Sequence, residues 1–372
     1  MESIRYLALG DSYTIGTGLE DEAQNFPSLL AARLRDETGI DVALTNLGVN
    51  GYTTTDLIRE ELPVARSARP ELVSILIGAN DVVQGSDEPT YRARLTQIYE
   101  AVKQLGVPGP RVLAISIPDF SALPGAAPFG TPSELRARID AFNAVAQYEA
   151  ASRPFRYVDI TSISREASTG DDWMAADGLH PGPAQHRAIA DHLWEVVAPT
   201  WRMVVFNRFS PLAKRVLDLA FAEVEAVRSQ YTGSEHILIG LLKVDGGDAR
   251  KVLDELRVTY RRVRKLLVAV LGRSQKTATA PATPILTTKT TQLLSAATHE
   301  ATKAGADTVA TEHLLIALIE SDGIAAHVLA DQGVTVTRMR GTMDRLEANP
   351  EGMSHQRQGA WSRLTARLLR KL

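Results

Sequence analysis

The first half of the chain alternates short apolar runs with longer stretches in which apolar residues recur every three or four positions. The short runs are nearly continuous in apolar residues, which predicts strands of a parallel sheet that is covered on both faces. The longer stretches predict amphipathic helices between those strands. The predicted strands are Ile4–Gly10, Val42–Leu47, Leu72–Gly78, Val112–Ile117 and Tyr157–Ile160, and the predicted helices include Phe26–Glu37, Thr55–Ala68, Thr90–Leu105, Ser133–Ala151 and Pro183–Val197.

The second half follows a different pattern and repeats itself. From Ser210 onward no stretch is a convincing strand, and helical patterns broken by Gly, Asp and Ser predict a separate all-α domain. Ser234–Leu242 (SEHILIGLL) aligns with Thr311–Ile319 (TEHLLIALI) at an offset of 77 residues, and Val252-Leu253 aligns with Val328-Leu329 at an offset of 76. One residue has therefore been lost from a loop of the second copy, and the matching registers predict two structural repeats.

These patterns divide the chain into two domains and a tail. The stretch between the repeats is rich in Thr, Ala and Pro, which is typical of a linker. The predicted segments are the α/β domain at 1–203, the helical domain at 206–349 with repeat one at about 206–272, a linker at 273–284 and repeat two at about 285–348, and a tail at 350–372.

Composition narrows the class of protein. The 372 residues are 44% hydrophobic and 23% charged, which is the balance of a folded soluble protein with two or three domains. No apolar run reaches the ~18 residues that a membrane span needs, and the first residues lack the apolar core of a secretory signal. The absence of cysteine excludes disulfides and cysteine-bound metals. We therefore expect a cytoplasmic protein.

Charge is distributed unevenly between the two halves. Residues 1–200 hold 16 Lys and Arg against 27 Asp and Glu, a net charge of −11, whereas residues 201–372 hold 25 against 17, a net charge of +8. Such an asymmetry suggests two domains with different partners. Because the basic residues of the second half are mixed with acids along helical patterns, nucleic-acid binding is not expected.

Residues that can carry chemistry gather at the carboxyl ends of the predicted strands, where open parallel sheets form their sites. Strand Ile4–Gly10 runs directly into G-D-S-Y, which places Ser12 at the sheet edge. Far downstream, D-G-L-H-P places Asp177 three residues before His180, so the carboxylate can orient the imidazole. Taken alone, Ser12 also suits a helix N-cap, and His180 also suits an ordinary loop histidine.

Two further segments supply hydrogen-bond donors at the same edge. N-L-G-V-N-G-Y-T follows the second strand and contains Gly48 and Gly51, and the N–H of a glycine can approach a ligand closely. G-A-N-D follows the third strand and contributes the amide of Asn80. The four segments together supply a nucleophile, a base, an N–H donor and an amide donor, which is the set that acyl transfer requires.

The four motifs, in this order, resemble the SGNH (GDSL-type) hydrolase family over about the first 200 residues. The resemblance implies a flavodoxin-like fold with about five parallel strands. It makes Ser12 the nucleophile, His180 the base and Asp177 the carboxylate that orients the base. No G-x-S-x-G occurs in the chain, so the unrelated α/β-hydrolase elbow is not supported.

The same resemblance implies an oxyanion hole. Its donors would be the N–H of Ser12, the N–H of Gly51 and the side-chain amide of Asn80. Gly48 competes for the glycine role, and Gly51 is preferred because it ends the N-x-x-x-x-G spacing and precedes Tyr52-Thr53.

The expected activity is that of a serine esterase, cleaving carboxylic esters or thioesters through an acyl-serine intermediate without a cofactor. No large insertion suggests a deep lipid tunnel, so we expect a small ester with a short or medium acyl group. The apolar loop Asp119–Thr131 either walls an acyl pocket or packs on the sheet edge. The alternative hypothesis is a non-enzymatic adaptor protein in which the hydrolase half serves as a scaffold.

The helical half resembles the N-terminal repeat domain of Clp-type ATPase chaperones, over roughly Phe206–Ala348. The resemblance rests on Phe209–Ala220 (FSPLAKRVLDLA) and on the two aligned segments that begin at Ser234 and Thr311. The chain contains no G-x-x-x-x-G-K-[ST], so the resemblance does not extend to a P-loop ATPase. It implies that residues 206–349 dock adaptor or substrate proteins.

The Glu-His pairs of the two repeats have the composition of metal ligands. Neither Glu235-His236 nor Glu312-His313 is followed by a second histidine four residues after the first, so a structural role is expected and no metal site is predicted. Ser234 and Thr311 are predicted to be helix N-caps, with Glu favourable in the first turn.

The tail ends in an amphipathic segment at 361–372. Its apolar side chains share one helical face and its basic side chains lie elsewhere. Such a segment suits an anionic membrane surface or a groove on a partner, and packing on its own protein is the alternative.

Overall fold

The computed structural model describes residues 3–165, 172–226, 229, 231–271 and 285–348. They form two compact units, residues 1–207 and residues 208–372. The predicted linker 273–284 and tail 350–372 lie outside the described residues, whereas the predicted boundary at 203–206 falls inside the 3-10 turn Arg202–Arg208.

The first unit is built on one parallel sheet. Its strand order is β2-β1-β3-β4-β5, with every neighbouring pair parallel, which is the order of a flavodoxin-like fold. The predicted fold class is therefore confirmed. Strand β1 has its predicted bounds, and the other four end one or two residues earlier than predicted. The strands are β1 (Ile4–Gly10), β2 (Val42–Asn46), β3 (Leu72–Leu76), β4 (Val112–Ile115) and β5 (Arg156–Val158).

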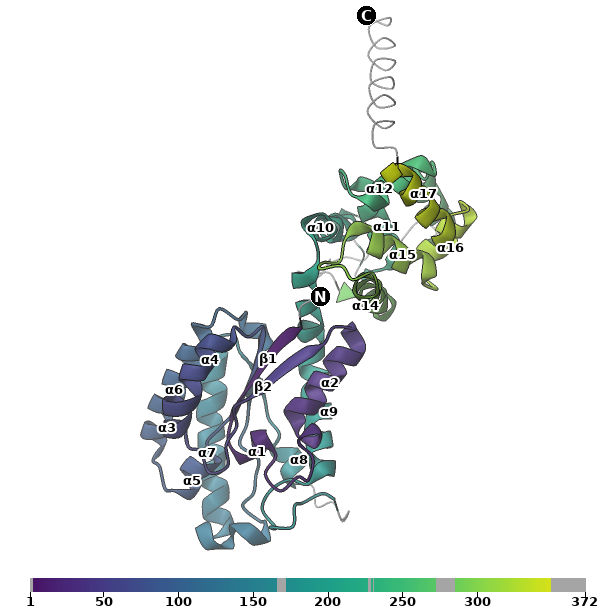
Figure 1. The fold of residues 1–372 in the computed structure, drawn as a ribbon. Coiled ribbons are helices and arrows are strands. Elements are labelled where there is room, and N and C mark those ends of the chain that lie inside the picture. Colours follow the sequence, from purple (N-terminus) through teal and green to yellow (C-terminus); the bar gives the residue numbers. More distant parts are fainter. Residues whose placement is uncertain (1–2, 166–171, 227–228, 230, 272–284, 349–372) are drawn as a thin grey trace, which may run out of the picture. The chain divides into compact units, whose positions relative to one another are not determined.

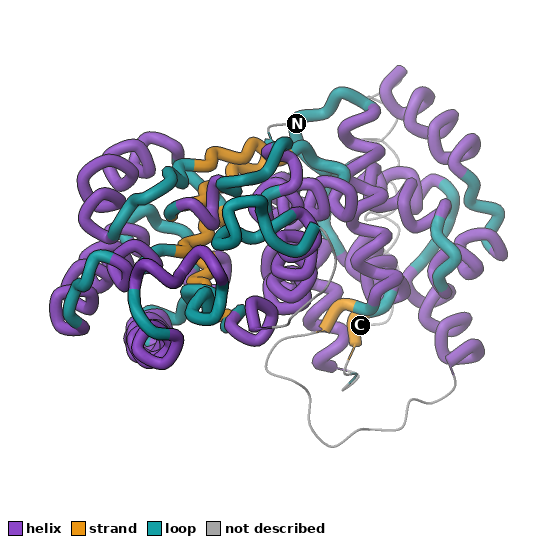
Figure 2. Tube along the Cα trace, turned by 90° about the horizontal axis from the view of Figure 1, so that it is seen from below, coloured by secondary structure: helices purple, strands orange, loops and turns teal. Residues whose placement is uncertain are grey.

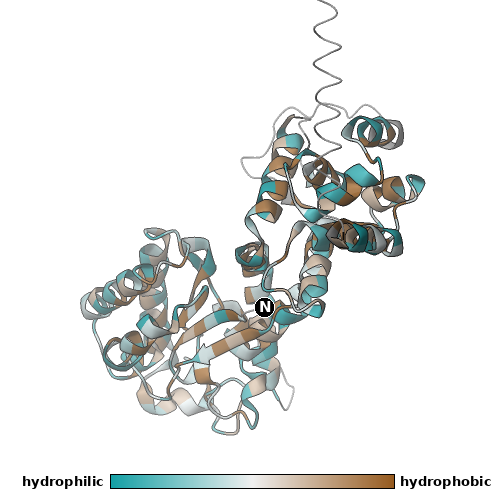
Figure 3. Cartoon of the chain, turned by 45° about the horizontal axis from the view of Figure 1, so that its top comes forward, coloured by the Kyte–Doolittle hydropathy of each residue, from teal (hydrophilic) through white to brown (hydrophobic). Residues whose placement is uncertain are grey.

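Helices cover both faces of this sheet, so its strands lie between two helical layers (Figures 1 and 2). Because both faces are covered, the strands carry apolar side chains on both sides, and Figure 3 shows them brown along much of their length. The edge of the Trp201 ring packs on Tyr6 of β1 at a centroid distance of 5.0 Å. One layer holds α2 (Phe26–Thr38) and α9 (Pro183–Trp201), and the other holds α4 (Leu62–Ala68), α6 (Glu88–Lys103) and α7 (Pro132–Ala151).

Local sequence signals set where these helices begin. The side chains of Asn25 and Asp87 cap α2 and α6, and Thr131 forms a reciprocal capping box with Glu134 at the start of α7. The stretch predicted as one helix at Thr55–Ala68 is instead three pieces, because a π turn interrupts it. These pieces are α3 (Thr54–Asp56), the π turn η2 (Leu57–Glu61) and α4.

The second unit contains two sets of four helices among its described residues. Equivalent helices begin 77, 77, 76 and 76 residues apart, so the predicted double repeat and its lost residue are confirmed. Positions aligned from the sequence, such as Leu253 with Leu329, are buried in both copies. The first set is α10 (Pro211–Ala226), α11 (Ser234–Lys243), α12 (Asp248–Glu255) and α13 (Tyr260–Leu271), and the second is α14 (Thr288–Lys303), α15 (Thr311–Glu320), α16 (Ile324–Asp331) and α17 (Val336–Ala348).

The second unit is helical as predicted, apart from one short ladder that the sequence did not indicate. The dipeptides β6 (Tyr231–Thr232) and β7 (Ile285–Leu286) pair as a short parallel ladder between the two repeats. The carbonyl oxygen of Thr232 also accepts the hydroxyl of Thr290 at 2.7 Å, which ties repeat one to α14. Two residues are too few to produce an alternating pattern, so the sequence carried no strand signal here.

The prediction that Ser234 and Thr311 are N-caps was wrong. The N-cap residues of α11 and α15 are Gly233 and Ala310, whose N–H groups donate to Nδ1 of the histidine three residues later, each at 3.0 Å. The Ser234 hydroxyl instead accepts the N–H of Ala325 at the start of α16, at 3.3 Å.

Thr311 of the second repeat caps a helix of the first repeat. Its hydroxyl accepts the N–H of Ala249 at the start of α12, at 3.4 Å. Each repeat therefore supplies a hydroxyl that caps a helix of the other repeat, and the Glu-His pairs have the structural role predicted for them. We call these two contacts the cross-repeat caps.

No single helix among the described residues has the length and apolarity to cross a membrane. One bent pair, Thr311–Glu320 with Ile324–Asp331, has the combined length and apolar composition of a membrane span, but the two helices meet at a bend of 91°.

Candidate active site

Ser12 follows strand β1 as the first residue of the short helix α1 (Ser12–Ile15) and is buried. Gly10 is needed just before it, because a Cβ there would collide with a carbonyl oxygen of strand β3. Asp11 caps the helix, and its Oδ1 accepts the N–H of Tyr13 at 3.1 Å. The N–H of Ser12 is the first of the helix, so it has no acceptor within the helix.

Asp177 and His180 form a direct pair on the loop before α9. Nδ1 of His180 donates to Oδ2 of Asp177 at 2.5 Å. Oδ1 of the same carboxylate accepts the backbone N–H groups of Leu179 at 2.9 Å and His180 at 3.0 Å. Partial burial raises the pKa of Asp177, but these hydrogen bonds outweigh it and hold the pKa below its ordinary value. The carboxylate therefore stays ionised and fixes the imidazole with its proton on Nδ1.

The loop of His180 lies against the turn Gly10–Tyr13, which contains Ser12. The ring of His180 packs on the ring of Tyr13, the residue next to Ser12, at a centroid distance of 5.8 Å and an interplanar angle of 55°. The imidazole is mostly covered, with 12% of the side chain exposed. Segments far apart in the sequence thus bring Ser12, His180 and Asp177 to one end of the sheet.

Asn80 links two further loops at this end of the sheet. It lies in the short helix α5 (Ala79–Val83), directly after the segment that follows β3. One hydrogen of its side-chain nitrogen donates to the carbonyl oxygen of Tyr52 at 2.9 Å. An amide nitrogen carries two hydrogens, so the other is left for a ligand.

The two candidate glycines differ in their surroundings. The N–H of Gly48 is already donated to Oδ1 of Asn46 at 3.0 Å, whereas the N–H of Gly51 has no acceptor within the described residues. A Cβ at Gly48 would lie 2.9 Å from the carbonyl oxygen of Asp11, but one at Gly51 would meet nothing within 4 Å. Gly51 has a φ of +82°, which explains the glycine there. Its free N–H supports Gly51 as the donor, and the crowding at Gly48 makes substitution there disruptive as well.

Three buried carboxyl groups lie close to the turn that contains Ser12, namely Asp11, Glu61 and Asp81. Glu61 comes from the π turn η2, and its Oε2 accepts the N–H of Gly10 at 2.9 Å. Asp81 accepts both the N–H and the hydroxyl of Thr54, at 2.8 and 2.5 Å. Through these contacts the carboxyl groups hold the elements that carry the site. Glu61 was not predicted as a site residue, because it is one of two adjacent glutamates and nothing in the local sequence distinguishes it from Glu60, which is exposed.

Burial shifts the protonation of this carboxyl cluster. It raises the pKa of Asp11 to about 7, with the neighbouring Asp81 adding to the shift, and it raises the pKa of Glu61 to about 9. The pKa of Asp81 is also raised by burial, although its hydrogen bonds to Thr54 oppose the shift. Glu61 is therefore a neutral acid near pH 7. Oδ2 of Asp11 and Oε1 of Glu61 are buried with no hydrogen-bond partner.

The chain matches two protein families. Residues 8–188 match the model of the GDSL-like lipase/acylhydrolase family. Residues 208–332 and 285–370 match the Clp repeat (R) N-terminal domain. The first half is a GDSL-like acylhydrolase domain, and the second half carries Clp repeats. This agrees with the motifs of both halves, and we refer below to the acylhydrolase unit and the Clp repeat unit.

Relatives of the Clp repeat unit come from large proteins. The chain is 33% identical over 153 residues to the "Negative regulator of genetic competence ClpC/MecB" of Bacillus subtilis (strain 168), covering 41% of this chain and 18% of that protein. It is 32% identical over 169 residues to the "ATP-dependent Clp protease ATP-binding subunit ClpC" of Staphylococcus aureus (strain USA300), covering 44% and 20%. The chain thus spans about a fifth of the length of these relatives.

Solved structures similar to this chain align with about half of it. A crystal structure of TesA covers 52% of this chain and 98% of its own, at 26% identity and a TM-score of 0.43. The acetylxylan esterase Axe2 of Geobacillus stearothermophilus covers 53% and 95%, at 21% identity and a TM-score of 0.44.

The apolar loop Asp119–Thr131 packs on the loop that carries Asp177 and His180. Within its 3-10 turn Pro124–Phe129, the N–H of Gly125 donates to the carbonyl oxygen of Gly178 at 3.0 Å. A Cβ at Gly125 would stand 2.8 Å from Cβ of Leu179 and 3.0 Å from the carbonyl oxygen of Asp177. The loop is thus in van der Waals contact with the segment that presents the Asp-His pair.

No group of three or more His, Asp or Glu side chains within the described ranges is arranged to hold a metal ion.

Proposed function

We propose that Ser12, His180 and Asp177 form the catalytic triad of a serine esterase. The observation that carries the proposal is the bond from Nδ1 of His180 to Asp177 at 2.5 Å, on a ring that packs beside the turn that contains Ser12. With its proton held on Nδ1, the imidazole keeps the lone pair of Nε2 for the Ser12 hydroxyl.

The reaction then follows two steps. Oγ of Ser12 attacks the ester carbonyl carbon while Nε2 of His180 takes its proton, and the leaving alcohol departs with that proton. Water, deprotonated by the same nitrogen, then attacks the acyl-Ser12 ester and releases the acid. Asp177 stabilises the imidazolium in both steps without taking the proton itself.

The negative oxygen of each tetrahedral intermediate needs donors that are free before substrate arrives. The N–H of Ser12, the N–H of Gly51 and the second hydrogen of the Asn80 amide meet this condition in the proposal. The bond to Tyr52 supports Asn80 in this role, because it fixes the amide before substrate binds.

The proposed substrate is a small ester or thioester with a short or medium acyl group. The contact between Gly125 and the catalytic loop that carries Asp177 and His180 supports the interpretation that Asp119–Thr131 walls the acyl side of the site. The proposed mechanism requires no cofactor.

Hydrolysis of p-nitrophenyl acetate and butyrate tests the triad. Ser12→Ala is expected to lower kcat by ~10⁴-fold or more while the fold is retained, because the acyl-serine cannot form. Equal rates for wild type and Ser12→Ala would remove Ser12 from the mechanism. Absence of turnover in both proteins would favour the adaptor hypothesis.

For the Clp repeat unit we propose that it docks a protein partner. We further propose that the protein works in the cytoplasm and that this unit does not bind nucleic acid. The two units are compact on their own, which supports a modular arrangement. Residues 1–207 should retain the kcat/KM of the full chain on a small ester, and capture of protein partners should require residues 208–348. A folded but inactive 1–207 fragment would contradict the modular proposal. The membrane or partner contact suggested for 361–372 stays a hypothesis about the tail.

A further inference from the structure

Helix α13 of the Clp repeat unit carries a cluster of positive charge that no acid balances. Arg261, Arg262, Arg264 and Lys265 are exposed, and none of them forms an ion pair within the part of the chain that the structure describes. The helix itself contains no Asp or Glu. The nearby basic residues of α12, by contrast, pair with acids on their own helix, as Arg250 does with Asp254.

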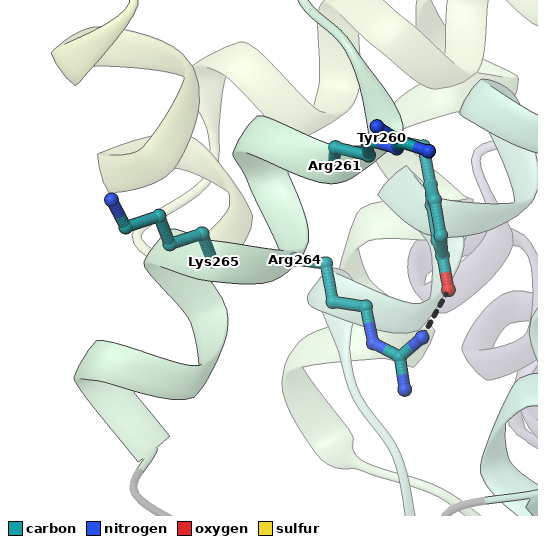
Figure 4. Close-up of a pocket in the computed structure, with 4 residues that line it drawn as sticks. All are labelled: Tyr260, Arg261, Arg264 and Lys265. Carbon is teal, nitrogen blue, oxygen red and sulfur yellow. Dashed lines mark hydrogen bonds between the residues drawn. The ribbon is translucent and has the colours of Figure 1, made fainter.

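Tyr260, Arg261, Arg264 and Lys265 line an open hollow of about 510 Å³. Figure 4 shows the side chains of Tyr260 and Arg264 directed toward each other, with Lys265 pointing away from the tyrosine. Nη1 of Arg264 donates to the tyrosine hydroxyl at 3.1 Å. Because this hydroxyl oxygen accepts from Arg264, its own hydrogen is left to donate to an oxygen of a ligand.

Two cations also lie near the face of the tyrosine ring. Nζ of Lys243 is 5.2 Å and Cζ of Arg264 is 5.8 Å from the ring centroid. Lys243 is itself paired with Glu223, which anchors it on the scaffold. Tyr260 is thus in contact with two cationic side chains, and the hollow lies on a described helix.

The second repeat shows that the fold does not require this cluster. Helix α17 occupies the equivalent place, and Val263 and Met339, which align at an offset of 76, are both fully buried. At the same offset Arg261 and Lys265 align with Thr337 and Gly341. The helix therefore forms and packs without the two charges.

The arginines of α17 also differ in having partners. Arg338 donates to the carbonyl oxygen of Gly333 at 3.0 Å, and Arg340 pairs with Glu300 at 3.4 Å. Among the described basic side chains of α13, only Arg264 has a partner, the Tyr260 hydroxyl. The unpaired guanidinium groups of Arg261 and Arg262 thus have no counterpart among the described residues of α17.

We propose that the α13 hollow binds an acidic segment of a partner protein. Guanidinium groups recognise carboxylates through paired N–H donors, and unpaired exposed cations are available for such contacts without breaking any ion pair. Residues 260–265 span only about 8 Å of helix, which suits two or three acidic side chains of a peptide. The inference rests on the proposed docking role of the Clp repeat unit.

Two other anionic ligands fit the hollow less well. An anionic membrane is favoured by apolar side chains that insert between lipids, and the four lining residues include none beyond the half-buried Tyr260. A nucleic acid is favoured by basic side chains that follow an extended backbone, whereas these lie on about two turns of one helix.

The test measures binding of a fluorescein-labelled peptide of alternating Glu and Ser to the full chain by fluorescence anisotropy. The double variant Arg261→Thr with Lys265→Gln removes two charges from the hollow. Arg338→Gln with Arg340→Gln removes two charges from the second repeat and is the matched control. Tyr260→Phe removes only the hydroxyl. Circular dichroism of every variant checks that the fold is kept.

The proposal predicts that the hollow variant weakens peptide binding at least fivefold, that Tyr260→Phe weakens it about twofold, and that the control changes it by less than twofold. Binding should weaken as salt rises. Equal losses in the hollow and control variants would overturn the proposal, because they would indicate unspecific attraction. No binding by wild type up to 1 mM peptide would overturn it too, as would stronger competition from a single-stranded oligonucleotide or from phosphatidylglycerol vesicles. None of these outcomes decides whether the Clp repeat unit docks a protein partner, because the capture experiment tests that role separately.

Discussion

The acylhydrolase unit and the Clp repeat unit differ in how many of their buried polar side-chain atoms lack a hydrogen-bond partner. In the described part of the acylhydrolase unit, seven buried side-chain atoms lack a hydrogen-bond partner. They belong to Asp11, Thr14 and Glu61, which lie near Ser12, and to Ser121, His186 and Trp201. In the described part of the repeat unit, only the hydroxyl of Thr232 is left in this state. There the hydroxyls of Ser234 and Thr311 each find a backbone N–H in the other repeat.

The difference reflects what each unit is built to do. A repeat meets its own equivalent residues across the interface between copies, so each polar group has a partner at a matching place. A catalytic site gathers unlike groups from separate loops and shifts their pKa values, and unsatisfied buried groups concentrate there. Substitutions of the same kind should therefore have different consequences in the two units.

Among substitutions outside the proposed triad, the largest effect is expected from Asn80→Ala. Losing one oxyanion donor should lower kcat by ~10²–10³-fold with little change in KM, because the interaction is made only with the transition state. Asn143→Ala is the control, since that amide bonds both the N–H and the carbonyl oxygen of Ile117 and serves the fold. It should lower the melting temperature more than Asn80→Ala does. A change confined to KM in Asn80→Ala would contradict the assigned role.

Gly125→Ala tests the contact between the apolar loop and the catalytic loop. The added methyl group must displace Leu179 or the backbone beside Asp177, so kcat/KM should fall about tenfold through misplacement of His180. Gly341→Ala is the matched change in the repeat unit, where a Cβ meets nothing within 4 Å. That variant should keep full activity and gain about 0.5–1 kcal/mol of stability from helix propensity. Unchanged turnover in Gly125→Ala would show that the two loops are not coupled.

Glu61→Gln tests the buried carboxyl cluster through pH. The pKa of Glu61 is about 9 in the folded state against 4.5 for an ordinary glutamate. As pH rises from 4.5 to 9, the unfolded state loses its proton first, so this group makes the folded state progressively less stable. The glutamine stays neutral and still accepts the N–H of Gly10.

Urea unfolding followed by tryptophan fluorescence measures the result. Glu61→Gln should gain on the order of 2 kcal/mol in unfolding free energy at pH 8 and nearly nothing at pH 4.5. Glu223→Gln in the repeat unit should instead lose roughly 0.5–1 kcal/mol at pH 8, because it leaves Lys243 without its anion. A gain for Glu61→Gln that is equal at both pH values would contradict the raised pKa.

The smallest effects are expected at the cross-repeat caps. Ser234→Ala and Thr311→Val should each cost about 1 kcal/mol, the usual value of a lost helix cap. Hydrogen–deuterium exchange locates the change: Ser234→Ala should speed exchange at Ala325, and Thr311→Val at Ala249. Faster exchange only within the helix that carries the substitution would show that the hydroxyls cap their own helices instead.

The fold could be predicted from the sequence where one pattern ran long enough. The strands are short runs of mostly apolar residues. The predicted ends of all strands except β1 were too late, because the residues that follow each strand leave the sheet for the next loop. At Gly78, for example, the chain leaves β3 with a φ of +127°. The π turn Leu57–Glu61 could not be predicted, because one extra residue per turn leaves the apolar pattern almost unchanged.

The site was predictable to the extent that its residues follow strands. Ser12, Gly51 and Asn80 come from segments that follow strands. Asp177 and His180 lie three residues apart on the loop before α9, and the structure places these two side chains in contact. Glu61 and the true partners of Ser234 and Thr311 depend on contacts between distant segments. Local sequence holds no record of those contacts, so both kinds of residue were missed or misassigned.

The most direct test of the account is covalent labelling with a fluorophosphonate, which reacts with a serine that a histidine activates. If His180 activates Ser12, one adduct is expected, located by mass spectrometry on the peptide that contains Ser12. The adduct should be absent in Ser12→Ala and at least ~10³-fold slower to form in His180→Ala. Labelling of another residue, or an unchanged rate in His180→Ala, would contradict the central claim that Asp177 and His180 activate Ser12.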